Sequence, residues 1–326
     1  MTESAIAHWS NPQVILVATN LLEEHRLMLH ATYQARLSNA KILLVHVAPP
    51  SYLRNEAHDD ISSIHSSPLL GNVKKRLDDL VNDFQREGIE CEPIVLKGLP
   101  DEQISLLVKS RSVDRVIVAT RNATGGSRLV EDSVAERLIA GLEVPVCIIG
   151  RRTHPGAACG TPLGRILFST SFEANDASAA RFASTLAEAH HSQLTLLHVL
   201  DTVGMSDQER ELARYMAHRR LSALVPREAR HRHQPLCLVR EGEPATIIVD
   251  EAGSMSQNLL ILGSPYPSVL SWLLGTSLVH QVVAESQCPV ITIRPNSATE
   301  FLQDTVDLTD KLAHLQGDVE ATVANH

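Results

Sequence analysis

Two serines, Ser133 and Ser277, stand at the start of matching helix-length segments, 144 positions apart (277−133). Each segment follows an apolar run of strand length, and the run before Ser277 ends on Gly263, where the earlier copy has Ala119 (263−119 is also 144). A strand followed by a loop that opens a helix is where open α/β sheets bind phosphate-bearing ligands. Hydroxyls and backbone amides at these helix starts are therefore the candidate ligand groups.

The same residue types also have purely structural interpretations. Ser133, Thr276 and Ser277 are suited to cap a helix N-terminus without any ligand. His46 and His198 lie inside apolar runs, so we expect buried, neutral imidazoles with hydrogen-bond partners. No set of nucleophile, base and acid recurs at equivalent positions of the two copies, so we expect no catalysis.

Composition narrows the class of protein. The chain has 326 residues and a formal net charge of −9, which argues against general affinity for nucleic acid. No uninterrupted apolar stretch approaches the roughly 18 residues of a membrane span, and the N-terminus lacks a signal-peptide pattern. Five cysteines without a spaced framework suit a reducing compartment. We therefore expect a cytoplasmic protein that binds neither nucleic acid nor membrane, and no metal motif is present.

Short unalternated apolar runs, typical of strands buried on both faces of a parallel sheet, alternate with amphipathic helical segments. The expected strands of the first copy are 14–18, 41–47, 93–96, 116–119 and 146–149. The pattern restarts after a stretch rich in proline, glycine and small residues. We predict domain 1 at 1–151, a linker at 152–163, domain 2 at 164–295, and an acidic amphipathic C-terminal helix and tail at 296–326.

Both halves resemble universal stress protein domains, and the whole chain resembles the tandem members of that family. The resemblance rests on the opening strands, the second strands LLVHV and LLHV, the turns beginning at Gly98 and Gly242, the segment 133–137 (SVAER) and the triplet 288–290 (CPV). It implies two Rossmann-like domains, each a five-stranded parallel sheet with helices on both faces. It also implies self-association through the last strand of each domain, as an intrachain pseudo-dimer that leaves a homodimer open.

Nucleotide-binding members carry Gly-x2-Gly-x9-Gly followed by Ser or Thr. In domain 1 this pattern falls on Ala119, Asn122, Asp132 and Ser133, so only the hydroxyl is kept. Domain 2 keeps more of the pattern: Gly263, then Gly275, Thr276 and Ser277, with Tyr266 in place of the middle glycine. The family position near the adenosine falls on Asn20 and Ser171, and the position beside the base falls on Val47 and Val199.

The resemblance therefore implies a non-catalytic stress-response or regulatory protein with at most one adenine-nucleotide site, an ATP site in domain 2, and an unidentified regulatory protein as partner. Two alternatives stay open. One is an ATP-dependent switch or slow ATPase that uses the domain 2 site. The other is a scaffold whose cleft holds an apolar or phospholipid-like ligand against Tyr266, Val269 and Trp272.

Overall fold

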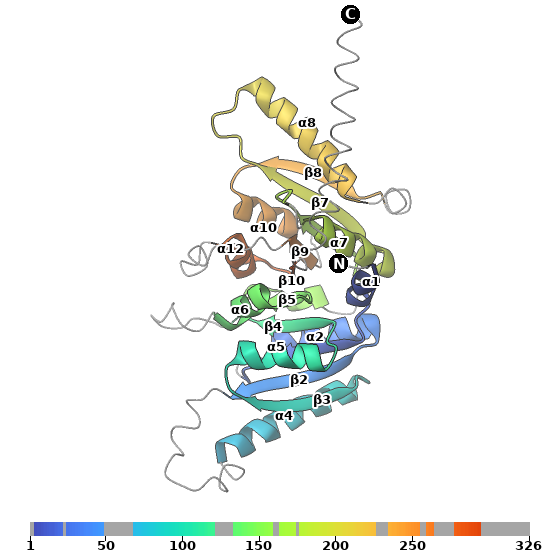
Figure 1. Cartoon of the computed structure of the whole chain (residues 1–326), viewed down its shortest axis with the longest axis vertical. Coiled ribbons are helices and arrows are strands. Elements are labelled where there is room, and N and C mark those ends of the chain that lie inside the picture. The colour runs from blue at the N-terminus through green and yellow to red at the C-terminus, as the bar shows by residue number, and fades with distance from the viewer. Residues whose placement is uncertain are drawn as a thin grey trace, which may run out of the picture.

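The computed structural model describes residues 3–21, 24–48, 68–120, 133–158, 163–173, 176–225, 234–254, 259–263 and 277–294. Within them the chain forms two successive α/β units, as the repeat predicts (Figure 1). The elements of domain 1 are β1 (Val14–Ala18), α2 (Glu24–Ser38), β2 (Lys41–Ala48), α4 (Pro68–Arg86), β3 (Cys91–Lys97), α5 (Pro100–Ser110), β4 (Arg115–Ala119), α6 (Ser133–Gly141) and β5 (Val146–Ile149).

Domain 2 repeats this order of elements after a short 3-10 turn, η2 (Pro155–Ala158). Its elements are β6 (Arg165–Ser169), α7 (Asp176–His190), β7 (Gln193–Leu200), α8 (Asp207–Leu224), β8 (Leu236–Glu241), α10 (Pro244–Ser254), β9 (Leu259–Gly263), α12 (Leu278–Glu285) and β10 (Val290–Ile293).

The described strands form one continuous sheet in the order β3-β2-β1-β4-β5-β10-β9-β6-β7-β8. Inside each domain the neighbouring strands are parallel. The two domains join where β5 and β10 pair antiparallel, with Val290 opposite Ile148, at the middle of the molecule in Figure 1. The predicted pairing of the two final strands is therefore confirmed, and the chain is an internal pseudo-dimer.

Side chains alternate between two buried faces of this sheet. Ile15 and Val17 of β1 belong to one hydrophobic cluster, which also takes in side chains of α1, α2, α4, α7 and α8. Leu16 belongs to a second cluster, with α5, α6, α10 and α12. Each cluster contains residues of both domains, so the apolar core runs across the β5–β10 junction. The strands are apolar at consecutive positions, without alternating polar residues, because helices cover both faces of the sheet.

The N-terminal segment adds a helix that the sequence pattern did not predict. Helix α1 (Glu3–Ser10) buries Ile6 and Trp9 and packs on α7 of the other domain. Figure 1 shows α1 beside α7, although 165 residues of the chain lie between these helices (176−10−1). The N-terminal helix therefore ties domain 1 to domain 2 outside the sheet.

The predicted linker packs closely where the structure describes it. Thr153 is buried, η2 contacts α2, and the His154 amide donates to the Gln287 carbonyl at 2.8 Å. The predicted C-terminal helix lies outside the described residues. Among the helices that are described, none has the length and apolar character needed to cross a membrane.

Candidate functional site

The candidate site of each domain lies where the strand order reverses, between β1 and β4 in domain 1 and between β6 and β9 in domain 2. Open α/β sheets bind ligands outside the carboxyl ends of the strands at this point. In domain 1, Asn20 follows β1 and Ala119 is the last residue of β4. In domain 2, Ser171 follows β6 and Gly263 is the last residue of β9. Val47 and Val199 lie near the ends of the adjoining strands β2 and β7. The structure thus brings these predicted positions together at the carboxyl edge.

The histidines of this edge have structural roles. His46 Nδ1 lies 3.0 Å from the Thr19 carbonyl oxygen, and His198 Nδ1 lies 2.8 Å from that of Thr170. Burial lowers the pKa of both imidazoles, although these backbone hydrogen bonds oppose the shift. The lowered pKa favours the neutral imidazole at pH 7 in both cases, and both histidines have the expected hydrogen-bond partner. His46 is buried as expected, whereas His198 is only half-buried.

In domain 2 an aromatic ring lies over the cleft histidine. The ring of Phe172 stacks on His198 with centroids 4.1 Å apart, and the Arg220 guanidinium of α8 lies 4.1 Å from the centre of the same ring. Phe172 follows β6 and lies one residue from Ser171. These groups occupy space beside Val199, the position that the resemblance assigns to the base.

A carboxylate that the sequence analysis missed lies in the same cleft. Asp176, the first residue of α7, is 3% exposed and accepts hydrogen bonds from the Thr170 hydroxyl and from the Glu173 amide at 3.1 Å. Desolvation raises the pKa of this carboxyl, and its hydrogen bonds act against that rise. An acidic residue at a helix start was the available signal, but Glu173, three residues earlier (176−173), carries the same signal.

Gly263 is the residue that admits this carboxylate. A Cβ atom added to Gly263 lies 2.1 Å from Asp176 Oδ1, a separation that real Cβ atoms essentially never show. The absent side chain at the end of β9 therefore makes room for Asp176. In domain 1 the equivalent strand end is Ala119, and the first residue of α2 is Glu24, whose longer side chain turns away to Arg76.

Of the predicted hydroxyl residues, the structure describes Ser133 and Ser277 but not Thr276. Ser277 caps α12, since its side chain accepts the His280 amide at 3.2 Å, as the capping interpretation predicts. His280 Nδ1 in turn lies 2.9 Å from Glu136 of α6, across the domain junction. Ser133 begins α6. The remaining predicted positions lie outside the described residues: Asn122, Asp132, Gly275 and Thr276, together with Tyr266, Val269 and Trp272 of the apolar-ligand alternative.

Comparison with known proteins identifies the family. The model of the universal stress protein family matches residues 12–150 and again residues 162–294. The chain belongs to the universal stress protein family. A universal stress protein of Methanocaldococcus jannaschii is 22% identical over 98 residues, which are 30% of this chain and 60% of that relative, so the match spans less than two thirds of the relative's length.

Solved structures agree with the Rossmann-like tandem fold. A universal stress protein of Archaeoglobus fulgidus aligns with a TM-score of 0.66 at 18% identity, over 87% of this chain and 97% of that one. A functionally unknown protein of Pseudomonas aeruginosa aligns with a TM-score of 0.58 at 14% identity, over 93% and 99% of the two chains. At these identities the likeness concerns the fold alone.

Beside the cleft of domain 1, this universal stress protein has a basic pocket of about 690 Å³. The Glu24 carboxylate is paired there with Arg76, with Nε to Oε1 at 3.2 Å, and Arg26 donates to the Gly150 carbonyl at 3.0 Å. The lining residues are Leu21, Glu24, His25, Arg26, Arg76, Arg151, Arg152, Thr153, His154 and Pro155. Four arginines line this surface against one carboxylate, and Arg152 is also paired with Glu285 at 2.7 Å, so the net positive charge comes from the remaining arginines.

The described residues show no metal site, and three of their thiols are buried in the core. No group of three or more histidine, cysteine or acidic side chains among them is placed to hold a metal ion. Burial raises the pKa of Cys91 to about 12 and those of Cys147 and Cys288 to about 11. These three thiols are protonated core residues.

Proposed function

We propose that this chain is a non-catalytic stress-response protein that acts by regulation and has at most one adenine-nucleotide site, in domain 2. The observation that carries the proposal is the carboxylate of Asp176 seated against Gly263. In nucleotide-binding relatives the glycine at this position is part of the motif that cradles the ligand. In this protein the Asp176 side chain fills the space beside Gly263.

The buried carboxylate also opposes phosphate electrostatically. Two unit charges about 4 Å apart repel by roughly 4 kcal/mol at an effective dielectric constant of about 20. A triphosphate laid over the end of β9 meets Asp176 within such a range, and burial leaves little water to screen the repulsion. Domain 1 lacks the first glycine altogether, since Ala119 stands there, so we place any nucleotide site in domain 2.

A regulatory role needs a surface for a partner protein. Helix α8 of domain 2 presents Leu212, Tyr215 and Met216, which are 62%, 59% and 50% exposed. Exposed large apolar side chains grouped on one helix are typical of protein contacts. We place the protein in the cytoplasm, because Cys91, Cys147, Cys237 and Cys288 are free thiols, as suits a reducing compartment.

Isothermal titration of Mg-ATP into the purified, nucleotide-free protein tests this proposal. We expect at most one weak site per chain and no hydrolysis in the wild type. The variant Asp176→Asn removes the charge at nearly constant shape, and we expect it to tighten ATP binding at least about tenfold, equivalent to 1.4 kcal/mol of relieved repulsion. The control Asp250→Asn removes an exposed charge from α10 of the same domain and is expected to leave the affinity unchanged.

Two results would overturn the proposal. One is the binding of two ATP molecules per wild-type chain with micromolar affinity. The other is steady ATP hydrolysis that Asp176→Asn leaves unchanged, which would favour the switch or slow ATPase instead.

A further inference from the structure

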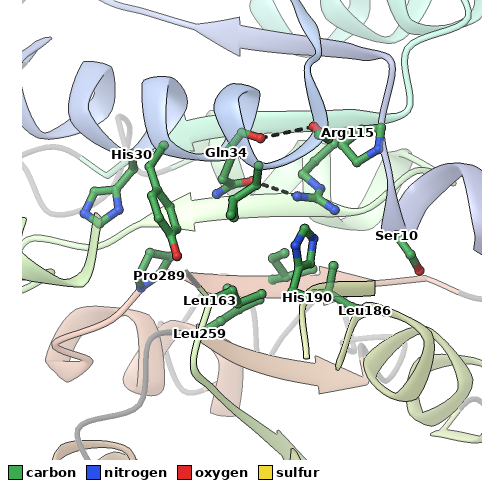
Figure 2. A pocket seen from close by; sticks show the side chains of 14 residues that line it. Ser10, His30, Gln34, Arg115, Leu163, Leu186, His190, Leu259 and Pro289 are labelled. Carbon is green, nitrogen blue, oxygen red and sulfur yellow. Dashed lines mark hydrogen bonds between the residues drawn. The ribbon is translucent and has the colours of Figure 1, made fainter. Parts of the chain in front are cut away.

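An arginine is enclosed where the two domains meet. Arg115, the first residue of β4 in domain 1, is 5% exposed. Its guanidinium carbon lies 6.0 Å from the ring centre of Phe182, which belongs to α7 of domain 2. Figure 2 shows the Arg115 side chain reaching from the ribbons of domain 1 toward His190, the last residue of α7. The positive charge is therefore held between the domains.

The partners of Arg115 are neutral. Its Nη1 donates to Gln34 Oε1 at 2.9 Å, its Nη2 donates to the Trp9 carbonyl at 2.6 Å, and its Nε has no partner. A guanidinium carries five N–H donors, so these two bonds leave it incompletely satisfied. No carboxylate among the described residues forms an ion pair with it. Burial lowers the pKa of Arg115 only to about 10, so the group is charged at neutral pH.

A small cavity adjoins this charge. Its volume is about 20 Å³, and its lining includes Arg115, Tyr33, His30 and His190. The Tyr33 hydroxyl and both ring nitrogens of His30 are buried without a hydrogen-bond partner, as is Arg115 Nε. A cavity volume of roughly 10–15 Å³ is needed to hold one water molecule, so this cavity has room for one or two particles the size of water. It excludes nucleotides and phosphate.

The polar groups of the cavity mostly donate. The guanidinium and the tyrosine hydroxyl offer N–H and O–H groups, and the neutral His30 imidazole offers one more N–H, whereas His190 is hydrogen-bonded to the Ser10 backbone. Burial lowers the pKa of His30 to about 4 and also lowers that of His190, so Arg115 supplies the charge. Leu163, Leu186 and Ile291 form apolar walls, which limit competition from bulk water. One net positive charge beside unpartnered donors, in a space for one or two particles the size of water, matches a monovalent, monatomic anion.

We propose that the cavity between the domains binds a single chloride-sized anion at Arg115, and that this anion stabilises the docked arrangement of the two domains. An unpaired buried charge is strongly unfavourable, and a bound anion neutralises it. A ligand held by the folded state alone stabilises it in proportion to its concentration. The site is separate from both carboxyl-edge clefts, so it does not depend on whether a nucleotide binds there.

Two measurements test the site. The first is anomalous scattering from crystals grown with sodium bromide, in which we expect one bromide peak beside Arg115 Nε. The second is urea denaturation at constant ionic strength, with chloride replacing gluconate. Above the dissociation constant, each tenfold rise in chloride is expected to raise the folding equilibrium constant by a factor that approaches ten.

Three variants make the denaturation test specific. Arg115→Met removes the charge, and we expect it to abolish the chloride dependence. Tyr33→Phe retains the shape and keeps the test valid if Arg115→Met does not fold; we expect it to weaken chloride affinity about tenfold, the effect of losing one hydrogen bond to a charged group. The matched control Arg86→Met alters an exposed arginine of α4 and is expected to keep the wild-type dependence. Equal stability in chloride and gluconate, or ordinary water density in place of the bromide peak, would overturn the proposal.

Discussion

The contact between Gly263 and Asp176 makes a quantitative prediction for the variant Gly263→Ala. The new Cβ atom lies 2.1 Å from Asp176 Oδ1, whereas ordinary van der Waals contact begins at 3.4 Å, so the carboxylate must withdraw by about 1.3 Å (3.4−2.1). That movement weakens the hydrogen bonds from Thr170 and from the Glu173 amide. Leaving buried partners unsatisfied costs about 1–3 kcal/mol, and overpacking costs about 1–3 kcal/mol.

We therefore expect Gly263→Ala to lower the free energy of unfolding by about 2–6 kcal/mol, the sum of the two costs. At roughly 2–4 °C per kcal/mol, the melting temperature falls by about 4–24 °C. Calorimetry and urea denaturation measure both quantities. The matched control is Gly253→Ala in α10, where the added Cβ meets nothing within 4 Å, and we expect it to be neutral or stabilising by about 0.5–1 kcal/mol.

A double-mutant cycle isolates the contact. Asp176→Ala removes the group that collides with the new methyl, so Gly263→Ala is expected to cost almost nothing in that background. The reasoning is refuted if Gly263→Ala behaves like Gly253→Ala. It is equally refuted if the alanine costs the same with and without Asp176.

Three further predictions follow from single side chains. Burial raises the pKa of Asp176 above the unfolded value of 3.8, so the folded state binds this proton more tightly than the unfolded state. The contribution of the carboxyl to the free energy of unfolding therefore falls as the pH rises from 3.8 to the raised pKa. We expect the difference in unfolding free energy between wild type and Asp176→Asn, measured by denaturation across that pH range, to fall in the same way; a constant difference would mean that the pKa is ordinary. Ser277→Ala removes the cap of α12 and is expected to cost about 1 kcal/mol without any ligand present. The control Ser110→Ala, at the exposed end of α5, is expected to cost less than half of that; equal effects in denaturation would contradict the capping role. Glu24→Gln breaks the pair with the exposed Arg76 and is expected to lower the midpoint of urea denaturation, an effect that should vanish in the Arg76→Met background.

Local pattern was sufficient to predict most of the fold. The unalternated runs are buried on both faces, and the internal repeat placed the strands of the second domain on those of the first. The pairing of β5 with β10 followed from the resemblance. Helix α1 was missed because only Ile6 and Trp9 mark its buried face, and because its packing surface, α7, lies far along the chain.

The site was predicted less completely, for a physical reason. Motif positions identified Gly263 and Ser277, yet they did not reveal which atoms fill the space beside them. Asp176 lies 87 residues before Gly263 (263−176), and no periodicity relates the two. Arg115 likewise opens an ordinary apolar strand, and only the docking of domain 2 encloses its charge. Such contacts arise from tertiary packing, which a single sequence does not display.

The most direct test of the filled cleft in domain 2 is a crystal structure of the wild-type protein grown with millimolar Mg-ATP. We expect the Asp176 carboxylate to remain over Gly263, hydrogen-bonded to Thr170, with no phosphate density at the end of β9. Phosphates lying over Gly263, with Asp176 rotated away, would contradict the conclusion that the protein fills this cleft with its own side chain.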